Sequence, residues 1–176
     1  ARMLADFVGA DRVENVNYTG DSEIFSSCYE FDVKLKDGNV LTAGITKAGG
    51  SVVYMLPDAA NAEVKLPEGD CIDQGLRFLE SHGYENMEVN YWRRLGGILT
   101  ANYAATQDGV VLYPDLVKLQ ISMKEGLVVG IEAANYLTNH KPRELLEPVI
   151  TEEEVRARVN PALTVQRVRR AVIPLE

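Results

Sequence analysis

The chain has 176 residues, 46% of them hydrophobic and 25% charged, which is typical of a globular protein with one domain or two small ones. Its net charge of −8 argues against nucleic acid and anionic membrane surfaces as partners, because both favour basic proteins. No apolar run approaches the roughly 18 residues of a transmembrane helix, and no signal peptide is visible. Because the sequence starts inside an apparent helix, we expect it to be an excised fragment.

A first unit is predicted for residues 1–57, as one helix followed by antiparallel strands. Residues 2–8 have the pattern of a helix that ends at Gly9, a residue type typical of helix C-termini. The other elements predicted here are a strand at 12–18, a polar loop at 19–27, a hairpin at 29–47, a strand at 51–56 and a linker at 57–62.

A second unit is predicted for residues 63–142, again with a helix first. Ile72, Leu76 and Leu79 fall on one face of this helix, for which we expect Asp70 as the N-cap and Gly83 as the stop. The strands predicted to follow are 86–94, 98–106 and a hairpin over 117–133.

The hairpin over residues 117–133 has the clearest pattern in the chain. Before its turn, Lys124-Glu125-Gly126, four apolar residues alternate with polar ones: Val117, Leu119, Ile121 and Met123. A two-residue loop would place Glu132 on the apolar face, whereas a three-residue loop with a glycine bulge keeps that face apolar. We therefore predict the pairs Val117–Ala133, Leu119–Ile131, Ile121–Val129 and Met123–Leu127.

The same device occurs at an offset of 88 positions earlier in the chain. There the turn is Lys36-Asp37-Gly38, and the apolar residues around it are Tyr29, Phe31, Val33, Leu35, Leu41, Ala43 and Ile45. This internal repeat indicates that the chain is built from related units.

Residues 147–176 are predicted to be the start of a third unit, which is incomplete. Thr151 and Glu154 have the spacing of a capping box for a helix that runs to Val159, where Asn160-Pro161 stops it. A strand is predicted at 163–175, and the hairpin expected after it is missing. One helix over a short antiparallel sheet in each unit makes the fold class α+β.

This order of elements resembles the PepSY domain, and the resemblance covers essentially the whole chain. The stretches 112–146 (LYPDLVKLQISMKEGLVVGIEAANYLTNHKPREL) and 151–176 (TEEEVRARVNPALTVQRVRRAVIPLE) are similar to the YpeB germination protein family. The resemblance implies the C-terminal tandem PepSY portion of such a protein, truncated at both ends.

The YpeB resemblance also implies a function in spores. Members of the family have an N-terminal membrane anchor and act in germination together with the cortex-lytic hydrolase SleB, each needing the other to accumulate in the spore. We therefore expect a non-catalytic protein-interaction module that stabilises, localises or inhibits SleB, at the outer face of the inner membrane and in the cortex region. The alternatives are a protease-propeptide-like inhibitor and a direct peptidoglycan-binding module.

Catalytic, cofactor and metal sites are not predicted. The two histidines, His82 and His140, have no carboxylate at a metal-site spacing, and no serine lies in a nucleophile elbow. Cys28 and Cys71 permit one disulfide or two free buried thiols. Cys71 lies near a helix start. Its thiol either has a lowered pKa or is buried in the core and unreactive.

The predicted partner-binding residues are the aromatic side chains Tyr91, Trp92, Tyr103 and Tyr113, because tyrosine and tryptophan are common interface anchors. Adjacent Tyr91 and Trp92 point to opposite faces of their strand, so we expect one of them to be exposed. The alternative for Trp92 is packing on the helix. The unpaired strand of the third unit is predicted to dock onto the second unit or to form a homodimer.

Overall fold

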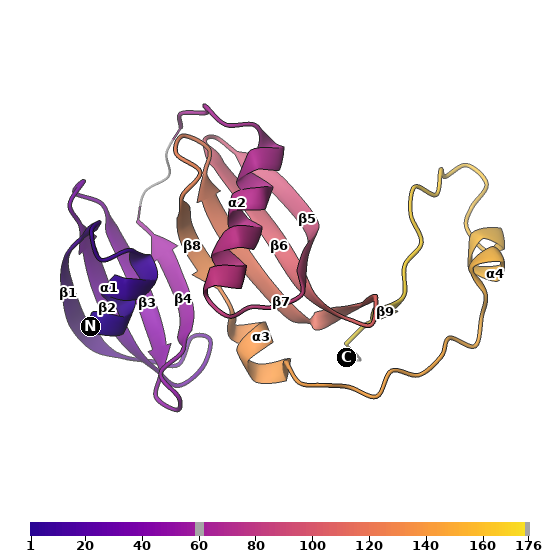
Figure 1. Cartoon of the computed structure of the whole chain (residues 1–176), viewed down its shortest axis with the longest axis horizontal. Helices are drawn as coiled ribbons and strands as arrows, with labels where there is room; N and C mark the ends of the chain where they lie inside the picture. Colours follow the sequence, from indigo (N-terminus) through magenta and orange to yellow (C-terminus); the bar gives the residue numbers. More distant parts are fainter. Residues whose placement is uncertain (59–61, 175–176) are drawn as a thin grey trace.

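The computed structural model describes residues 1–58 and 62–174 of the chain (Figure 1). Part of the predicted linker (59–61) and residues 175–176, the first of which ends the last predicted strand, lie outside the described residues. The helices are α1 (Arg2–Val8), α2 (Glu68–Ser81), α3 (Ala134–Asn139) and α4 (Glu152–Ala157). The strands are β1 (Val13–Ser22), β2 (Cys28–Leu35), β3 (Val40–Thr46), β4 (Val52–Pro57), β5 (Met87–Leu95), β6 (Ile98–Gln107), β7 (Val110–Ser122), β8 (Val128–Glu132) and β9 (Ala171–Val172).

The strands of the described residues form one continuous sheet in the order β1-β2-β3-β4-β8-β7-β6-β5, with β9 paired to β7. All pairs are antiparallel except β7–β9, which confirms the α+β class. The strands of the first two predicted units join where β4 pairs with β8, at Tyr54–Glu132 and Met55–Ile131. The sequence did not predict this joining of two short sheets into one.

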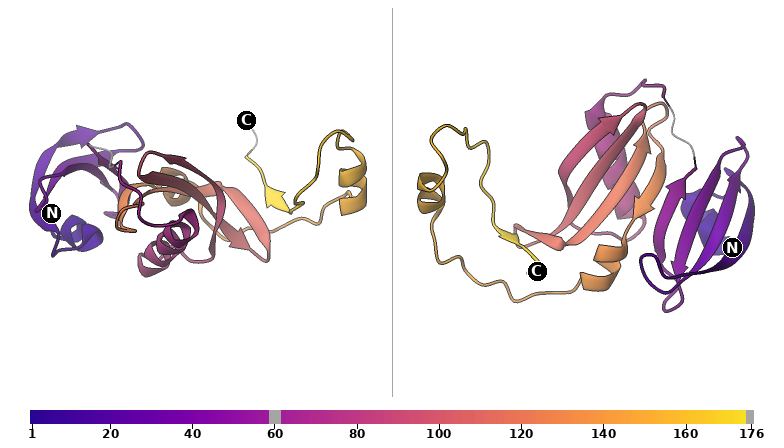
Figure 2. Two further views of the ribbon diagram at one scale, coloured as in Figure 1. Left: turned by 90° about the horizontal axis from the view of Figure 1, so that it is seen from above. Right: turned by 180° about the vertical axis from the view of Figure 1, so that it is seen from behind.

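Helices α1 and α2 cover the same face of the sheet, as the view from above shows (Figure 2). Their buried residues, among them Leu4 of α1 and Leu79 of α2, belong to one hydrophobic cluster with the strands of both halves. The rings of Phe7 and Phe78 meet edge to face at 5.5 Å between their centres, so the two helices touch. Burial in a single core therefore favours folding of both halves together.

The predicted register of the β7–β8 hairpin is right in its middle and wrong near its turn. Leu119 pairs with Ile131 as expected. Next to the turn, a register shift pairs Ile121 with Val128 instead of Val129. Val128 is accordingly buried, at 8% exposed, because a bulge moves the following side chain to the other face.

The internal repeat superposes hairpins and not whole units. The offset places β2 on β7 and β3 on β8, which are the second and third strands of the first half but the third and fourth of the second half. The second half has β5 and β6 between its helix and the repeated hairpin, whereas the first half has only β1 there and gains β4 after the hairpin.

Several predicted element boundaries are wrong, among them that of the polar loop predicted at 19–27, because β1 extends to Ser22. Helix α2 begins after Pro67 instead of at Asp70, so the N-cap has no side-chain hydrogen bond. The strand predicted at 163–175 is reduced to Ala171–Val172, which runs parallel to Val111–Leu112 of β7. Most of that segment gains no neighbouring strand within the described chain, and an extended segment becomes a strand only by pairing.

Helix α4 begins with the predicted capping box. The side chain of Thr151 accepts a hydrogen bond from the backbone N–H of Glu154 at 3.2 Å, and the carboxylate of Glu154 accepts one from the N–H of Thr151 at 2.8 Å. The helix ends at Ala157, two residues before the predicted end. No helix in the described ranges is both long and apolar enough to cross a bilayer.

The two cysteines are free and buried, which confirms the alternative of two separate thiols. Cys28 packs with Val53 and Tyr54, whereas Cys71 belongs to the main core under the helices. Burial raises the pKa of the Cys71 thiol, which favours the inert alternative over a reactive thiolate.

Helix α2 approaches the sheet closely at Gly75. The hydroxyl of Tyr103 on β6 donates a hydrogen bond to the carbonyl oxygen of Ile72 at 3.0 Å, with the Tyr103 side chain fully buried. A Cβ on Gly75 would lie 2.1 Å from that hydroxyl, far inside van der Waals contact. Gly69 in the same helix has no atom within 4 Å of such a Cβ.

The two glycines of α2 make a matched pair of predictions. Gly75→Ala should destabilise the fold by about 1–3 kcal/mol, because the new methyl group forces Tyr103 or the helix to move. Gly69→Ala should be neutral or stabilising by up to about 1 kcal/mol through helix propensity. Urea unfolding measures both, and equal effects of the two variants would contradict the close approach.

On the uncovered face, the ring of Tyr54 lies across β3. A Cβ on Gly44 would be 2.3 Å from the ring, and the hydroxyl beyond it donates to Glu30 on β2 at 2.6 Å. Burial, followed by this hydrogen bond, raises the pKa of Tyr54 to about 12. Burial also raises the pKa of Tyr84 to about 12.

These two tyrosines predict the behaviour of the protein at alkaline pH. The unfolded chain loses their protons near the ordinary pKa of 10.0, whereas the folded chain keeps them until about pH 12. Stability should therefore be unaffected by them below pH 10 and fall as the pH rises from about 10 to 12. Near-ultraviolet absorbance of tyrosinate during a pH titration tests this, with Tyr54→Phe assigning one late step. Ionisation of every tyrosine near pH 10 while the fold persists would refute it.

Candidate interaction surface

Strand β7 contains a bulge that buries a carboxylate. Ala104 of β6 pairs with Leu116, but the next residue, Ala105, pairs with Leu112, so residues 113–115 form an insertion in β7. The last of them, Asp115, is 0% exposed. A buried carboxylate is stable only with charged or hydrogen-bonding partners.

Arg143 supplies the partner charge for Asp115. Its guanidinium donates to both carboxylate oxygens, at 2.7 and 2.6 Å, and this contact raises the pKa of Arg143. Nδ1 of His140 lies 2.8 Å from the same carboxylate. The side-chain amide of Gln107 exchanges two hydrogen bonds with the backbone of Arg143, at 2.7 and 3.0 Å. These contacts fix the chain where it leaves the second half of the fold.

Beyond this anchor, residues 144–174 form an arm that projects from the sheet and returns to it (Figure 1). Helix α4 lies at the far end of the arm, and β9 marks its return. On the returning leg, the guanidinium of Arg169 forms a bidentate ion pair with Glu88 of β5. The arm is therefore attached to the second half at both of its ends.

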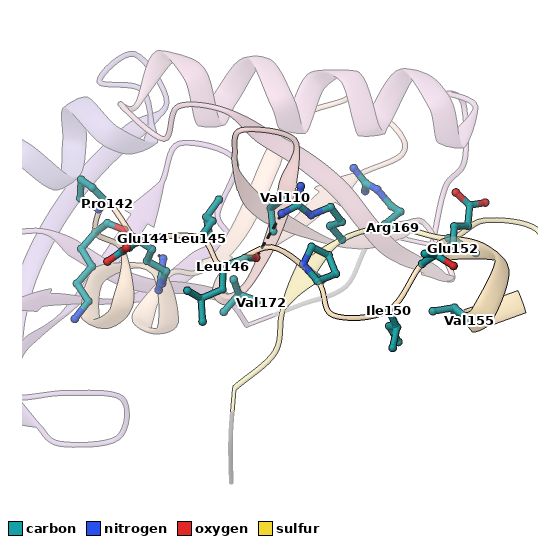
Figure 3. Close-up of a pocket in the computed structure, with 17 residues that line it drawn as sticks. Val110, Pro142, Glu144, Leu145, Leu146, Ile150, Glu152, Val155, Arg169 and Val172 are labelled. Carbon is teal, nitrogen blue, oxygen red and sulfur yellow. Dashed lines mark hydrogen bonds between the residues drawn. The ribbon is translucent and has the colours of Figure 1, made fainter. Parts of the chain in front are cut away.

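A pocket of about 1010 Å³ lies between the two legs of the arm (Figure 3). Its apolar lining comes from both legs and from the start of β7: Val110, Pro142, Leu145, Leu146, Pro148, Ile150, Val155, Val168, Ala171 and Val172. Leu146 is 84% exposed and the neighbouring Val149 is 99% exposed. Contiguous exposed apolar surface of this kind is typical of protein–protein contact sites.

The predicted partner-binding aromatics are separated by the structure. Tyr91 pairs with Asn102 and Trp92 with the buried Ala101, so Trp92 faces the helix side and Tyr91 the uncovered side. Both remain accessible, at 59% and 40% exposed. Tyr113 is half-buried, and its hydroxyl donates to the side chain of Asn90 at 3.1 Å. Tyr103, fully buried beneath α2, has no surface to offer a partner, and we remove it from the candidate set.

The uncovered face of the sheet contains a polar groove beside Tyr91, with a volume of about 310 Å³. Its lining comes from four neighbouring strands: Tyr91, Arg93, Thr100, Asn102, Lys118, Gln120 and Glu132. Lys118 and Glu132 form an ion pair at 2.9 Å across β7 and β8. Neither α1 nor α2 covers this face, which Figure 2 shows from behind.

The histidines have structural contacts. The ring of His82 stacks on Phe78 at 4.0 Å, with Nδ1 2.7 Å from the Phe78 carbonyl oxygen. The ring of His140 stacks on Tyr136 at 4.2 Å. Within residues 1–58 and 62–174, no three His, Cys, Asp or Glu side chains gather in a way that would hold a metal ion.

Sequence reasoning missed the Asp115–Arg143 anchor. The two residues are far apart in the chain, and Asp115 lies in a stretch that reads as a simple strand leading into the hairpin. A signal was present in Pro114-Asp115, because proline inside a strand pattern marks a bulge or an edge.

These features define an α+β protein in which helices α1 and α2 cover one face of a shared antiparallel sheet, whereas the other face and the arm are open for contacts. The chain belongs to the YpeB sporulation family: the family model for the PepSY1 and PepSY2 domains matches residues 1–146. This match confirms the resemblance predicted from the sequence.

Curated relatives carry the name sporulation protein YpeB. The relative from Halalkalibacterium halodurans is 33% identical over 129 residues, covering 73% of this chain and 29% of the relative. The relative from Bacillus subtilis is 28% identical over 151 residues, covering 83% and 34%. The chain thus spans about a third of the length of these proteins.

A solved structure, the Bacillus megaterium YpeB C-terminal domain, is similar with a TM-score of 0.86 and 22% identity. The similarity covers 98% of this chain and 77% of that one. It supports the fold described above.

The ion pair of Asp115 with Arg143 predicts that the two arginines of this region differ in their contribution to stability. Arg143→Ala should destabilise the fold by about 3–5 kcal/mol, because it leaves the Asp115 carboxylate buried without its main partner. Arg170→Ala is the control: this arginine pairs with the exposed Glu147 at 3.3 Å, so its loss should cost less than about 1 kcal/mol. Chemical unfolding of both variants measures the difference. Similar losses would show that Asp115 does not depend on Arg143.

Proposed function

We propose that this chain is a non-catalytic protein-binding module that acts in sporulation or germination and that its partner is the cortex-lytic hydrolase SleB. Membership of the YpeB sporulation family supports the sporulation role. The identity of the partner and the place of action, the outer face of the spore inner membrane and the cortex region, follow from the family resemblance alone.

The observation that carries the protein-binding role is the apolar pocket of the arm. An arm held at both ends, with a largely apolar lining and side chains such as Leu146 almost fully exposed, offers area that a partner can bury. Burial of such side chains contributes roughly 25 cal/mol per Å² of apolar surface, which makes the arm the strongest candidate for contact.

Three aromatic residues extend the proposed contact surface to β5 and β7. Tyrosine and tryptophan side chains that are at least partly accessible lose little conformational entropy on binding and supply large contact areas. Tyr91, Trp92 and Tyr113 therefore stay in the proposal as partner contacts. Arg169 joins the two regions, since its ion pair with Glu88 attaches the arm to β5.

The division into units at 1–57, 63–142 and 147–176 is also part of the proposal. The first boundary coincides with the connection between β4 and α2, and the second follows the Arg143 anchor. In this division the arm is the beginning of a third unit. Docking of its strand onto β7 of the second unit is the intramolecular contact expected for it.

Calorimetric titration of this chain into purified SleB, with hydrolase activity read on the same mixture, tests the proposal. Trp92→Ala and Leu146→Ser should each weaken binding about tenfold or more if these side chains are central contacts. Ile24→Ser is the matched control, because Ile24 is 74% exposed but lies in the first half, between β1 and β2.

The outcomes distinguish the possible roles. Binding with reduced activity indicates an inhibitor, and binding with full activity indicates a stabilising or placement module. Absence of binding at tens of micromolar would refute a direct contact through this chain. Protease inhibition or retention by isolated peptidoglycan would instead favour one of the two alternatives, and dimerisation detected by light scattering would identify a second copy as the partner of the arm.

A further inference from the structure

The two repeated turns of the sequence have no role in the proposed function, yet the structure brings them to one place. Residues of both turns, Asp37 from the first and Glu125 from the second, line a pocket of about 220 Å³. The pocket lies at the junction of the two halves, at the end of β7 opposite to the one where β9 of the arm pairs.

The pocket exists because the junction is short. Two residue pairs join β4 to β8, at Tyr54–Glu132 and Met55–Ile131. Past these pairs, β4 and β8 no longer pair with each other. Both strands contribute to the pocket lining there, β4 with Pro57 and β8 with Val129. Ligand sites form preferentially at such junctions between units.

Ser122 is the buried polar group of this pocket. It is 3% exposed, and its hydroxyl has no hydrogen-bond partner among the residues that the structure describes. Its backbone is fully engaged, because its N–H donates to Leu127 at 2.8 Å and its carbonyl oxygen accepts from Gly126 at 2.7 Å. The free hydroxyl therefore has capacity for a ligand, since buried polar groups are normally paired.

The charges around the pocket favour a cation. The carboxylate of Asp37 already has partners. The backbone N–H of Asn39 and, less strongly, the charge of Arg12 stabilise its ionised form and so lower its pKa. Glu125 forms no ion pair within the described ranges, and the adjacent Lys124 is directed to Glu63 at 3.3 Å. The lining thus contains one carboxylate without an ion-pair partner and one hydroxyl without a hydrogen-bond partner among the described residues.

We propose that this pocket binds a primary ammonium group with a short aliphatic chain, either of a free amine or of a lysine side chain of another protein. Glu125 supplies the opposite charge, and the hydroxyl of Ser122 accepts a hydrogen bond from one of the three N–H donors. The aliphatic chain contacts the apolar part of the lining: Leu35, Val40, Leu41, Pro57, Ile98 and Val129.

An ammonium fits this lining better than the other charged ligands. An anion would face two carboxylates, Asp37 and Glu125, against Arg12 alone. A divalent metal ion requires more oxygen ligands than the pocket offers, and no group of three metal-binding side chains gathers here in the described chain. A bound ammonium would contact residues of both halves and so hold them in one relative orientation.

The experiment is an NMR titration with two probes, n-butylammonium chloride and Nα-acetyl-lysine N-methylamide. Saturable shifts should map to both turns, at residues 36–39 and 122–127. Ser122→Ala and Glu125→Gln should each weaken binding about tenfold, as expected for loss of a charge-assisted contact. Added salt should weaken it further.

The control variants are Ser81→Ala, at the exposed end of α2, and Glu153→Gln on α4, and both should bind like the original chain. Ser122→Ala removes a hydroxyl without a protein partner, so it should fold normally, which a thermal unfolding curve verifies. Binding of n-butylammonium alone would identify a small amine as the ligand, whereas binding of both probes would identify a lysine side chain as an accessible source.

Three results would overturn the proposal: no saturation with either probe, shifts outside the two turns, or unchanged affinity in both Ser122→Ala and Glu125→Gln. None of them bears on the SleB proposal, because that rests on the arm and on β5. Conversely, absence of SleB binding would leave this pocket unaffected.

Discussion

The pairing of β4 with β8 is the contact on which the rest of the structure depends. Two residue pairs, together with the hydrogen bond from the Ala133 N–H to the Val53 carbonyl oxygen at 2.7 Å, join the strands of both halves into one sheet. Because the sheet is continuous, α1 and α2 share one core on one face and leave the other face open. The same short junction leaves room for the pocket between the two repeated turns.

Close approaches on both faces make this sheet specific. Under α2, the absence of a side chain at Gly75 admits the hydroxyl of Tyr103, and on the open face Gly44 admits the ring of Tyr54. In each case the tyrosine hydroxyl donates a hydrogen bond to a neighbouring element: Tyr103 to the carbonyl oxygen of Ile72, and Tyr54 to the carboxylate of Glu30. The glycines thus serve packing across elements, a role distinct from that of the glycines in the turns.

The buried Asp115 connects the fold to the proposed function. Its ion pair with Arg143 fixes the point at which the chain departs, and β9 with Arg169 fixes its return. Between these attachments the arm exposes apolar side chains that the other described residues do not cover. The surface offered to a partner is therefore a consequence of one buried carboxylate and its counter-charge.

The sequence by itself determined the α+β class, most strands, the Leu119–Ile131 register, the α4 capping box and the family, because these depend on local periodicity, capping chemistry and motif. Only the tertiary structure decided the single sheet, the shift beside the β7–β8 turn, the Asp115 anchor and the burial of Tyr103. Each of these depends on which distant residues meet: β4 with β8, Asp115 with Arg143, Tyr103 with α2. Aromatic content alone could not separate the exposed Tyr91 and Trp92 from Tyr103, since strand alternation gives the two sides of a strand but not which side a helix covers.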